Sequence, residues 1–206
     1  MRKIPTVFQR DPDNMRYVTR NVHPDCQWVL DGEGTPTYKW DGTSVLIDDD
    51  GAMWKRRELK AGQTEPDGFR LEGHDETTGK TVGWMPCNRD NPDDRWHWEA
   101  YDPHPQFESI SAPHKPGTYE LLGPKVQGNP HKFDNHVLMP HGAMPFNAAD
   151  GEFYAPPPLG YDGLAEWMTE FAKRDAKAAL GFEGIVWHHP DGRMAKLKAR
   201  DFPKVG

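Results

Sequence analysis

The chain has 206 residues, which is enough for one domain with a substantial core and too few for two comfortable ones. Its formal net charge of −7 argues against a protein that coats nucleic acid through a uniformly basic surface. The sequence has no run of about 18 apolar residues that would predict a transmembrane helix. Its first residues lack the apolar core of a secretory signal, so none is expected.

The two cysteines, Cys26 and Cys87, lie far apart and belong to no paired metal-binding motif. This pattern favours two separate thiols over a disulfide or a zinc site. Free thiols are typical of a reducing compartment, and a cytoplasmic location is therefore expected.

Twenty glycines and twenty prolines divide the chain into short segments, which favours strands over long helices. The first thirty residues and residues 62–83 are polar and give no strong pattern. A hairpin is predicted at 43–47 and 53–57, around the Asp48–Gly51 turn. Further strands are predicted at 81–85, 96–101, 117–122 and 136–139, and a second hairpin at 183–188 and 193–198.

One helix is predicted, at residues 163–180. Its apolar residues recur at helical spacing, and Gly181 stands after it as a candidate C-cap. The elements together predict an antiparallel, β-rich α+β domain.

The segment Lys39-Trp40-Asp41-Gly42 places a lysine directly before a tight Asp-Gly element, with β-prone residues on both sides. A lysine in this position can be held at the mouth of a pocket while its ammonium group points inward. A solvated lysine entering an ordinary β-turn would have the same sequence. The segments that follow decide between these two interpretations.

Four further segments follow in order, at residues 54–59, 117–130, 182–187 and 194–198. Residues 120–130 read Glu-Leu-Leu-Gly-Pro-Lys-Val-Gln-Gly-Asn-Pro. The ordered set resembles the nucleotidyltransferase motifs of ATP-dependent polynucleotide ligases and mRNA capping enzymes. Within that superfamily it is most similar to compact RNA ligases of the RNA ligase 1 type. The resemblance extends over roughly residues 35 to 200.

The resemblance implies a single nucleotidyltransferase (adenylation) domain over residues 1–206, with a nucleotide cleft between sheets and few helices. The sequence stops shortly after Lys198, so no appended oligonucleotide-binding domain is expected. This disfavours DNA ligases and capping enzymes, which append one.

The activity implied by the resemblance is ATP-dependent RNA ligation, with RNA repair as its setting. Lys39 would attack the α-phosphorus of ATP and form a lysyl-AMP. The AMP would pass to the 5′-phosphate of an RNA, and a 3′-hydroxyl would then displace it. ATP and Mg²⁺ are the implied cofactors, with Mn²⁺ as an alternative ion, and RNA ends are the implied partner.

The resemblance also implies roles for individual residues. Lys196 and Lys198 alternate with Leu197, so both leave one face of a strand and can clamp a phosphate. A carboxylate in the apolar strand around Glu120 is costly unless it is paired or bound to metal. The implied catalytic residues are Lys39, Lys196 and Lys198; the implied nucleotide-binding residues also include Tyr38, Asp41, Gly42, Arg56, Arg57, Glu120 and Glu183, of which Glu120 and Glu183 would bind metal.

Some assignments stay open. Arg56 and Arg57 must point to opposite faces of a strand, and Arg56 is preferred as the one facing the cleft. The residue that stacks on adenine could come from segment 136–142, or be Phe133 or Phe146. Alternative functions are a DNA ligase, a GTP-dependent guanylyltransferase, and a non-catalytic nucleotide- or RNA-binding module.

Overall fold

The structure, a computed structural model, describes residues 4–76, 78–102, 114–146, 155–178 and 181–203. The chain forms two compact units within this range. The terminal unit comprises residues 4–40 and 142–203, and the middle unit comprises residues 41–141. The chain therefore leaves the terminal unit directly after Trp40 and returns to it after His141.

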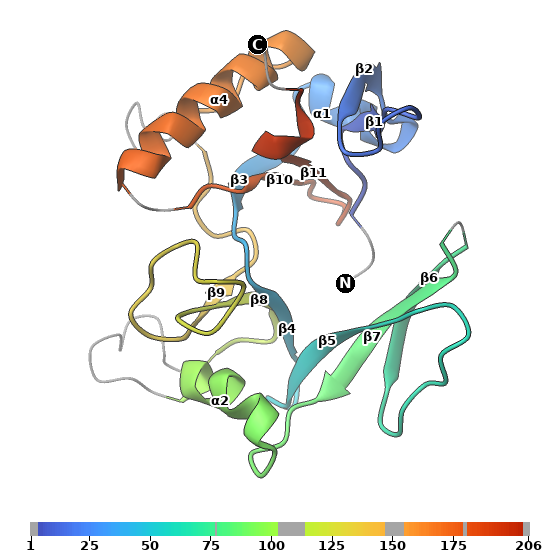
Figure 1. The fold of residues 1–206 in the computed structure, drawn as a ribbon, viewed down its shortest axis with the longest axis vertical. Helices are drawn as coiled ribbons and strands as arrows, with labels where there is room; N and C mark the ends of the chain where they lie inside the picture. Colours follow the sequence, from blue (N-terminus) through green and yellow to red (C-terminus); the bar gives the residue numbers. More distant parts are fainter. Residues whose placement is uncertain (1–3, 77, 103–113, 147–154, 179–180, 204–206) are drawn as a thin grey trace. The chain divides into compact units, whose positions relative to one another are not determined.

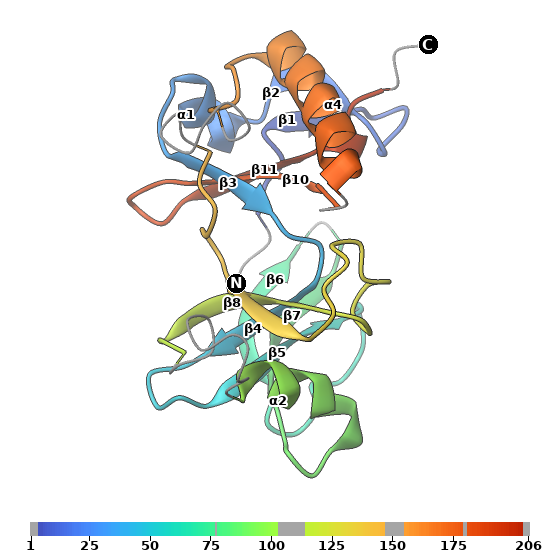
Figure 2. The ribbon, with the colours of Figure 1, turned by 90° about the vertical axis from the view of Figure 1, so that its left-hand side faces the viewer.

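The terminal unit contains a three-stranded antiparallel sheet in the order β11-β10-β3 and a two-stranded ribbon, β1-β2. Its strands are β1 (Phe8–Arg10), β2 (Val18–Val22), β3 (Thr35–Lys39), β10 (Gly184–His188) and β11 (Met194–Lys198). Its helices are α1 (Gln27–Leu30), α4 (Tyr161–Ala178) and the short 3-10 turns η1 (Pro24–Cys26) and η5 (Ala199–Asp201). Figures 1 and 2 show α4 lying over one face of the three-stranded sheet.

Aromatic side chains join α4 to this sheet. The ring of Tyr38 on β3 lies 6.4 Å from that of Phe171 on α4 and 5.4 Å from that of Phe182, measured between centroids. Phe146 packs 5.3 Å from Phe171. The 3.6-residue helical repeat places four buried residues on the same face of α4: Leu164, Met168, Phe171 and Asp175.

The middle unit is built on a six-stranded antiparallel sheet in the order β6-β7-β5-β4-β8-β9. Its strands are β4 (Thr43–Ile47), β5 (Met53–Leu59), β6 (Arg70–Asp75), β7 (Lys80–Pro86), β8 (Gly117–Leu122) and β9 (Val137–Pro140). The 3-10 turn η2 (Pro92–Asp94) leads directly into α2 (Arg95–Tyr101).

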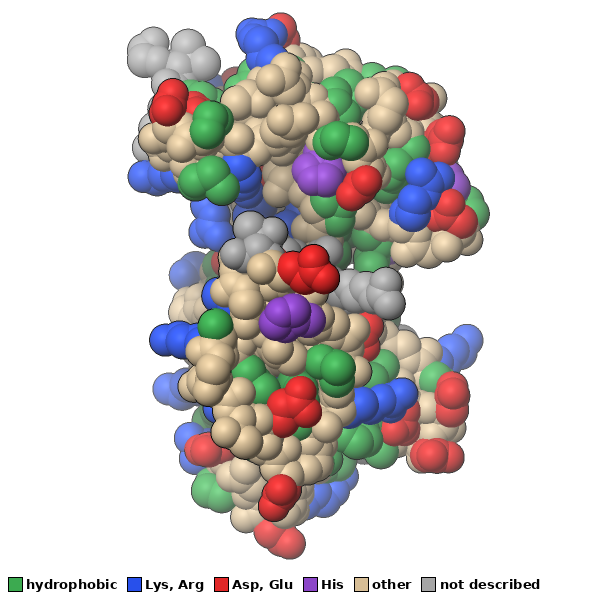
Figure 3. Space-filling view, turned by 90° about the vertical axis from the view of Figure 1, so that its right-hand side faces the viewer, with side chains coloured by type: hydrophobic (Ala, Val, Ile, Leu, Met, Phe, Trp, Pro, Cys, Tyr) green, Lys and Arg blue, Asp and Glu red, His purple; other side chains and the backbone are tan. Residues whose placement is uncertain are grey.

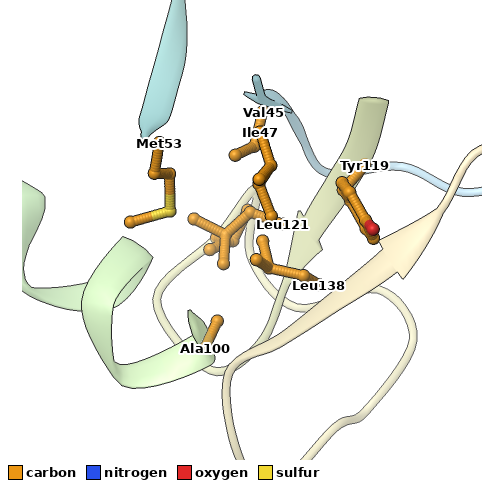
Figure 4. Close-up of a cluster of buried hydrophobic side chains, with 8 residues drawn as sticks. Val45, Ile47, Met53, Ala100, Tyr119, Leu121 and Leu138 are labelled. Atoms are coloured by element: carbon orange, nitrogen blue, oxygen red, sulfur yellow. The ribbon is translucent and has the colours of Figure 1, made fainter. Parts of the chain in front are cut away.

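The core of the middle unit lies between its sheet and α2 (Figure 4). Val45 and Ile47 alternate along β4, so their side chains leave the same face of the sheet. Tyr119 on β8 is the cross-strand neighbour of Val45 and belongs to the same cluster. Ala100 brings α2 onto this apolar surface.

Both predicted hairpins are confirmed. β4 pairs with β5, and β10 pairs with β11. The turn between β4 and β5 places Gly51 at φ +77°, a backbone conformation that glycine adopts without strain. The predicted strands at 81–85, 117–122 and 136–139 correspond to β7, β8 and β9, with shifts of one residue at some ends.

The predicted strand at 96–101 is wrong, because these residues form α2. The helix has clear start signals that outweigh its aromatic content. Asn91 caps η2 by accepting a hydrogen bond from the backbone N–H of Asp93, and Pro92 follows at a position that suits the first helical turn. Trp96, Trp98 and Tyr101 favour a strand in isolation, but the cap and the packing of Ala100 select the helix.

The predicted helix at 163–180 is confirmed as α4, which begins two residues earlier, at Tyr161. Residues 179 and 180 lie outside the described residues, so the capping role of Gly181 stays a prediction. Gly181 has φ +72°, a value in keeping with that role. The polar N-terminal segment, for which no element was predicted, contains β1, β2 and α1, and residues 62–83 contain β6.

On the face seen in Figure 3, acidic and basic side chains are interspersed among hydrophobic and other surface atoms. This face therefore carries no uniform basic coat, as the net charge indicates. Of the helices that the structure describes, none has both the length and the apolar character needed to cross a membrane.

Candidate functional site

Two lysines of the terminal unit lie in one row across the three-stranded sheet. Gly184 on the central strand β10 pairs with Lys39 on β3 at one side and with Lys198 on β11 at the other. Directly paired residues in antiparallel strands send their side chains to the same face. Lys196 lies two residues before Lys198 on β11 and therefore shares that face.

A single buried carboxylate holds the row together. Glu183 precedes β10, and the exposed fraction of its side chain is 6%. Its Oε2 accepts a hydrogen bond from Lys39 Nζ at 2.5 Å, and its Oε1 forms an ion pair with Lys198. Arg200 adds a more distant contact at 3.8 Å. Burial alone would raise the pKa of Glu183, but the charges of Lys39 and Lys198 outweigh it and the pKa is lowered. Glu183 is therefore an ionised counter-charge at neutral pH.

Lys196 is a lysine of this cluster whose pKa is clearly lowered. Burial, together with the positive charges of Lys198 and Lys39, lowers the pKa of Lys196 to about 8, against opposing contributions from Glu183 and Asp201. A lysine with a pKa in this range changes charge close to physiological pH. Such a shift, produced by burial and specific charged neighbours, is typical of functional sites.

Gly184 allows the strands of this site to come close together. A Cβ built at this position would lie 2.1 Å from the carbonyl oxygen of Leu197, on the neighbouring strand. Gly184→Ala is therefore expected to force β10 away from β11 and to lower the free energy of unfolding by about 1–3 kcal/mol. Urea denaturation monitored by tryptophan fluorescence measures this loss. The control is Gly192→Ala, at the exposed turn of the same hairpin, where a Cβ meets no atom within 4 Å but the φ of +90° is unfavourable. An equal or larger loss for Gly192→Ala would contradict the strand-contact explanation.

Tyr38 anchors the strand that carries Lys39. Its side chain is buried, and its hydroxyl donates to Asp175 Oδ1 on α4 at 3.1 Å. The other carboxylate oxygen of Asp175 accepts from the backbone N–H of Phe182, next to Glu183. The buried carboxylate of Asp175 thus links β3, the strand that carries Lys39, to Phe182, the residue before Glu183. The structure places the side chain of Tyr38 in the core, and its predicted contact with the nucleotide stays a prediction.

Glu120 lies in the middle unit and is surrounded by hydrogen-bond donors. Its Oε1 accepts from the backbone N–H of Gly42 at 3.1 Å. Its Oε2 accepts from Ser44 Oγ at 3.3 Å and lies 2.8 Å from His141 Nε2. Groups of the protein therefore pair this carboxylate, and its binding of a nucleotide or a metal ion stays a prediction.

Gly42 and Asp41 form the start of the middle unit. A Cβ at Gly42 would lie 2.2 Å from the carbonyl oxygen of Leu121, so β4 begins in direct contact with the backbone of β8. The backbone N–H of Asp41 donates to Nε2 of the buried His131 at 2.8 Å. Both residues therefore shape the backbone that follows Lys39 in the sequence.

Arg56 and Arg57 lie next to each other on β5 and point to opposite faces, as predicted. Arg56 is partly buried, with its Nε shielded from solvent and lacking a hydrogen-bond partner, whereas Arg57 is exposed. The preference for Arg56 as a ligand-binding residue agrees with this burial, and its role in a cleft stays a prediction.

The candidates for stacking on adenine differ in accessibility. Phe146 is 2% exposed and belongs to the aromatic core, which makes it a poor choice. Phe133 is partly buried and lies against His131 at 6.4 Å. Phe133 is therefore the better placed of the two rings.

Sequence reasoning missed several partners of these residues. His141 and Ser44 bind Glu120, and Asp175 binds Tyr38. Both strands next to His141 were predicted, at 117–122 and 136–139, but their pairing was not. In the observed register Glu120 faces Met139, so His141, two residues further, projects from the same face. Asp175 also occupied a core position of the predicted helix.

Comparisons with known proteins agree with the motifs. The family model for RNA ligase 1 matches residues 58–203, which include Glu120, Glu183, Lys196 and Lys198. Lys39 precedes the matched range. RNA ligase 1 from Danio rerio is 28% identical over 141 residues, covering 58% of this chain and 39% of the relative.

RNA ligase 1 from Pongo abelii is 27% identical over 143 residues and that from Rattus norvegicus is 27% identical over 141 residues, with the same coverage. The matched part of the chain thus spans well under half the length of these relatives. The family model nevertheless covers most of the chain, so the protein belongs to the RNA ligase 1 family.

Proposed function

We propose that the protein is an ATP-dependent RNA ligase that joins 5′-phosphate and 3′-hydroxyl ends through a lysyl-AMP on Lys39. The observation that supports this most strongly is the pairing of Lys39 and Lys198 with one buried carboxylate, Glu183. Lys196, with its lowered pKa, lies on the same face of the sheet. The relatives are named RNA ligase 1, which supports RNA as the proposed substrate.

In the first step Lys39 Nζ attacks the α-phosphorus of ATP. An N–P bond forms, the bond between the α-phosphorus and the bridging oxygen breaks, and pyrophosphate leaves. The attacking amine must be uncharged, and the proton that it loses passes to water. Glu183 holds Lys39 in place through the ion pair, and its lowered pKa makes it a poor proton acceptor. Lys196 and Lys198 provide positive charge for the phosphoryl oxygens.

The family implies a divalent cation. Mg²⁺ prefers oxygen ligands, keeps several waters, and is commonly held by one or two carboxylates together with substrate phosphates. Glu183 in the terminal unit and Glu120 in the middle unit are each a buried carboxylate that could supply one such ligand. When bound, the ion neutralises the charge of the triphosphate.

The two later steps use the same type of displacement at phosphorus. The AMP passes from Lys39 to the 5′-phosphate of an RNA, and a 3′-hydroxyl then attacks that phosphate and releases AMP. Because each step needs positive charge around the phosphorus attacked, the same lysines serve all three. The proposed setting is RNA repair in the cytoplasm, where the two free cysteines would remain reduced.

The pH dependence of the first step tests the role of Lys196. With a pKa of about 8, Lys196 is protonated below this pH and loses its charge above it. The adenylation rate of the protein, relative to that of Lys196→Arg, is expected to fall as the pH rises through about 8, because arginine stays charged. Rates are measured at ATP concentrations well below saturation, where they report on the free enzyme. A ratio that stays constant from pH 8 to 10.5 would contradict this role.

A labelling and joining assay tests the function itself. The chain is incubated with Mg²⁺ and either α-labelled ATP or α-labelled GTP, and then with RNA carrying a 5′-phosphate and a 3′-hydroxyl. Label on the protein from ATP, followed by joined RNA, is the expected result. Label from GTP alone would favour a guanylyltransferase, joining of nicked DNA alone a DNA ligase, and ATP binding without labelling a non-catalytic module.

A further inference from the structure

Three potential metal ligands meet in the middle unit, on elements that the proposed ligase reaction does not use. Cys87 follows β7, Asp94 closes η2 and His97 lies in the first turn of α2. One ligand atom from each residue lies within 4.8 Å of the other two. Sequence spacing alone did not indicate this site, because it contains a single cysteine and a single histidine.

His97 supplies the strongest reason to expect a ligand. Its side chain is 9% exposed, and neither Nδ1 nor Nε2 has a hydrogen-bond partner. A buried imidazole normally satisfies at least one ring nitrogen, since an unpaired buried polar group costs about 1–3 kcal/mol. A metal ion bound to one nitrogen would remove that cost.

Asp94 is held in the manner of a metal-binding carboxylate. It is fully buried, and its Oδ2 accepts from the backbone N–H of Asn88 at 2.9 Å. Asn91 Nδ2 contacts the same oxygen at 3.4 Å, and Lys55 forms an ion pair with Oδ1. Outer hydrogen bonds of this kind fix the orientation of ligands in metal sites.

Cys87 is the ligand with the most access to solvent. It is partly buried, and its backbone N–H donates to the carbonyl of Met53, which fixes the end of β7 against β5. Burial, together with Asp94, raises the pKa of the Cys87 thiol to about 12, despite the opposing charge of Lys55. The thiol is therefore protonated in the free protein, and binding of a metal must release its proton.

We propose that Cys87, Asp94 and His97 bind one Zn²⁺ ion. A thiolate, an imidazole and a carboxylate form a ligand set that zinc accepts in tetrahedral geometry, with a water in the fourth position. At ordinary zinc bond lengths the ligand atoms of a tetrahedral site lie roughly 3.3–3.7 Å apart. Side-chain rotations that bring the atoms closer by about 1 Å complete the site.

The charges are compatible with a divalent ion. The Cys87 thiolate and the Asp94 carboxylate together carry −2, which balances Zn²⁺. The ammonium of Lys55 remains hydrogen-bonded to Asp94 as an outer partner. The bound ion would tie the end of β7 to η2 and α2, whose residue Ala100 packs on the core of the middle unit.

The test measures binding of the metal alone to the full chain, without ATP or RNA. The chelator-treated protein is dialysed against Zn²⁺ and analysed for metal, and a parallel sample receives Co²⁺. We expect one zinc per chain and a cobalt spectrum with a sulfur-to-metal charge-transfer band. Zinc is also expected to raise the midpoint of thermal unfolding, because it binds the folded state.

Variants assign the site. Cys87→Ala and His97→Phe are each expected to weaken zinc binding by more than about 100-fold, since even outer partners of a ligand contribute roughly 10- to 100-fold. His97→Phe keeps an aromatic ring of similar size in the buried position, and circular dichroism verifies its fold. Cys26→Ala is the matched control, because Cys26 is a buried thiol in the terminal unit.

Three results would overturn the proposal. They are the absence of stoichiometric zinc in the folded protein, a charge-transfer band that survives Cys87→Ala, and equal loss of binding in Cys26→Ala. Because no nucleotide is present, failure of this test leaves the proposed ligase activity unaffected, and failure of adenylation leaves zinc binding unaffected.

Discussion

Lys39→Arg is expected to lower the rate of AMP transfer to the protein by at least about 10⁴-fold, the scale on which enzymes lose activity when a covalent nucleophile is removed. Arginine keeps a positive charge beside Glu183, so the ion pair that closes the site is preserved. It offers no uncharged nitrogen that could attack phosphorus, because its guanidinium group does not lose its proton in proteins. The rate of labelling by α-labelled ATP measures the effect.

Two control measurements test whether this loss is specific to the reaction of Lys39. Lys173→Arg, at an exposed position of α4 where the lysine pairs with Glu170, is expected to label at the rate of the unchanged protein. ATP binding, measured by calorimetry, should persist in Lys39→Arg. Labelling of Lys39→Arg at an undiminished rate would remove Lys39 from the mechanism.

Glu183→Gln is expected to reduce the rate of adenylation by roughly 10²–10³-fold, comparable with the loss of one preorganised electrostatic contact in an active site. Glutamine has the same shape but lacks the charge that balances Lys39 and Lys198. The two ammonium groups then repel each other across Gly184, and Lys39 loses its fixed position.

The same substitution is expected to lower the free energy of unfolding by about 2 kcal/mol. Removing one partner from a buried ion pair costs about 3–5 kcal/mol, and the lysines here retain some exposure to solvent, which reduces the cost. Urea denaturation at neutral pH measures the change.

Glu58→Gln provides the matched control for Glu183→Gln. Glu58 also pairs with a lysine, Lys80, at 2.7 Å, but both side chains are 45% exposed. An exposed pair of this kind contributes little, so a change within about 0.5 kcal/mol is expected, with normal adenylation. If Glu183→Gln behaves like Glu58→Gln, the charge of Glu183 contributes neither to adenylation nor to stability, and the proposed site is incorrect.

The elements that could be predicted from sequence are those whose pattern is local. The Asp48–Gly51 turn marks a hairpin because Gly51 accepts a positive φ, and α4 is recognised because its buried residues recur at helical spacing. The missed elements are short. β1 has three residues and α1 has four, too few for a periodic pattern to be detected, and their packing partners lie far away in the sequence.

In the candidate site, too, local patterns could be predicted and contacts between distant segments could not. Alternation along β11 was sufficient to place Lys196 and Lys198 on one face. The pairing of β3 with β10 could not be read from a local pattern, because it brings Lys39 to Glu183 across most of the chain. The lowered pKa of Lys196 likewise depends on burial and on charges that only the folded chain assembles.

The sequence also did not reveal that the ligands of the proposed zinc site lie together. Cys87 precedes η2, and Asp94 and His97 stand three residues apart, a spacing that puts them on one side of a helical turn. The error in assigning 96–101 to a strand concealed this arrangement, because it replaced the helical turn that brings His97 to the same side as Asp94.

Intact-mass spectrometry after incubation with ATP and Mg²⁺ tests most directly whether the protein becomes covalently adenylated. The account predicts a species heavier by one AMP, with the modification mapped to the peptide that contains Lys39, and no such species for Lys39→Arg. An unchanged mass under these conditions, or an adduct on a peptide without Lys39, would contradict it.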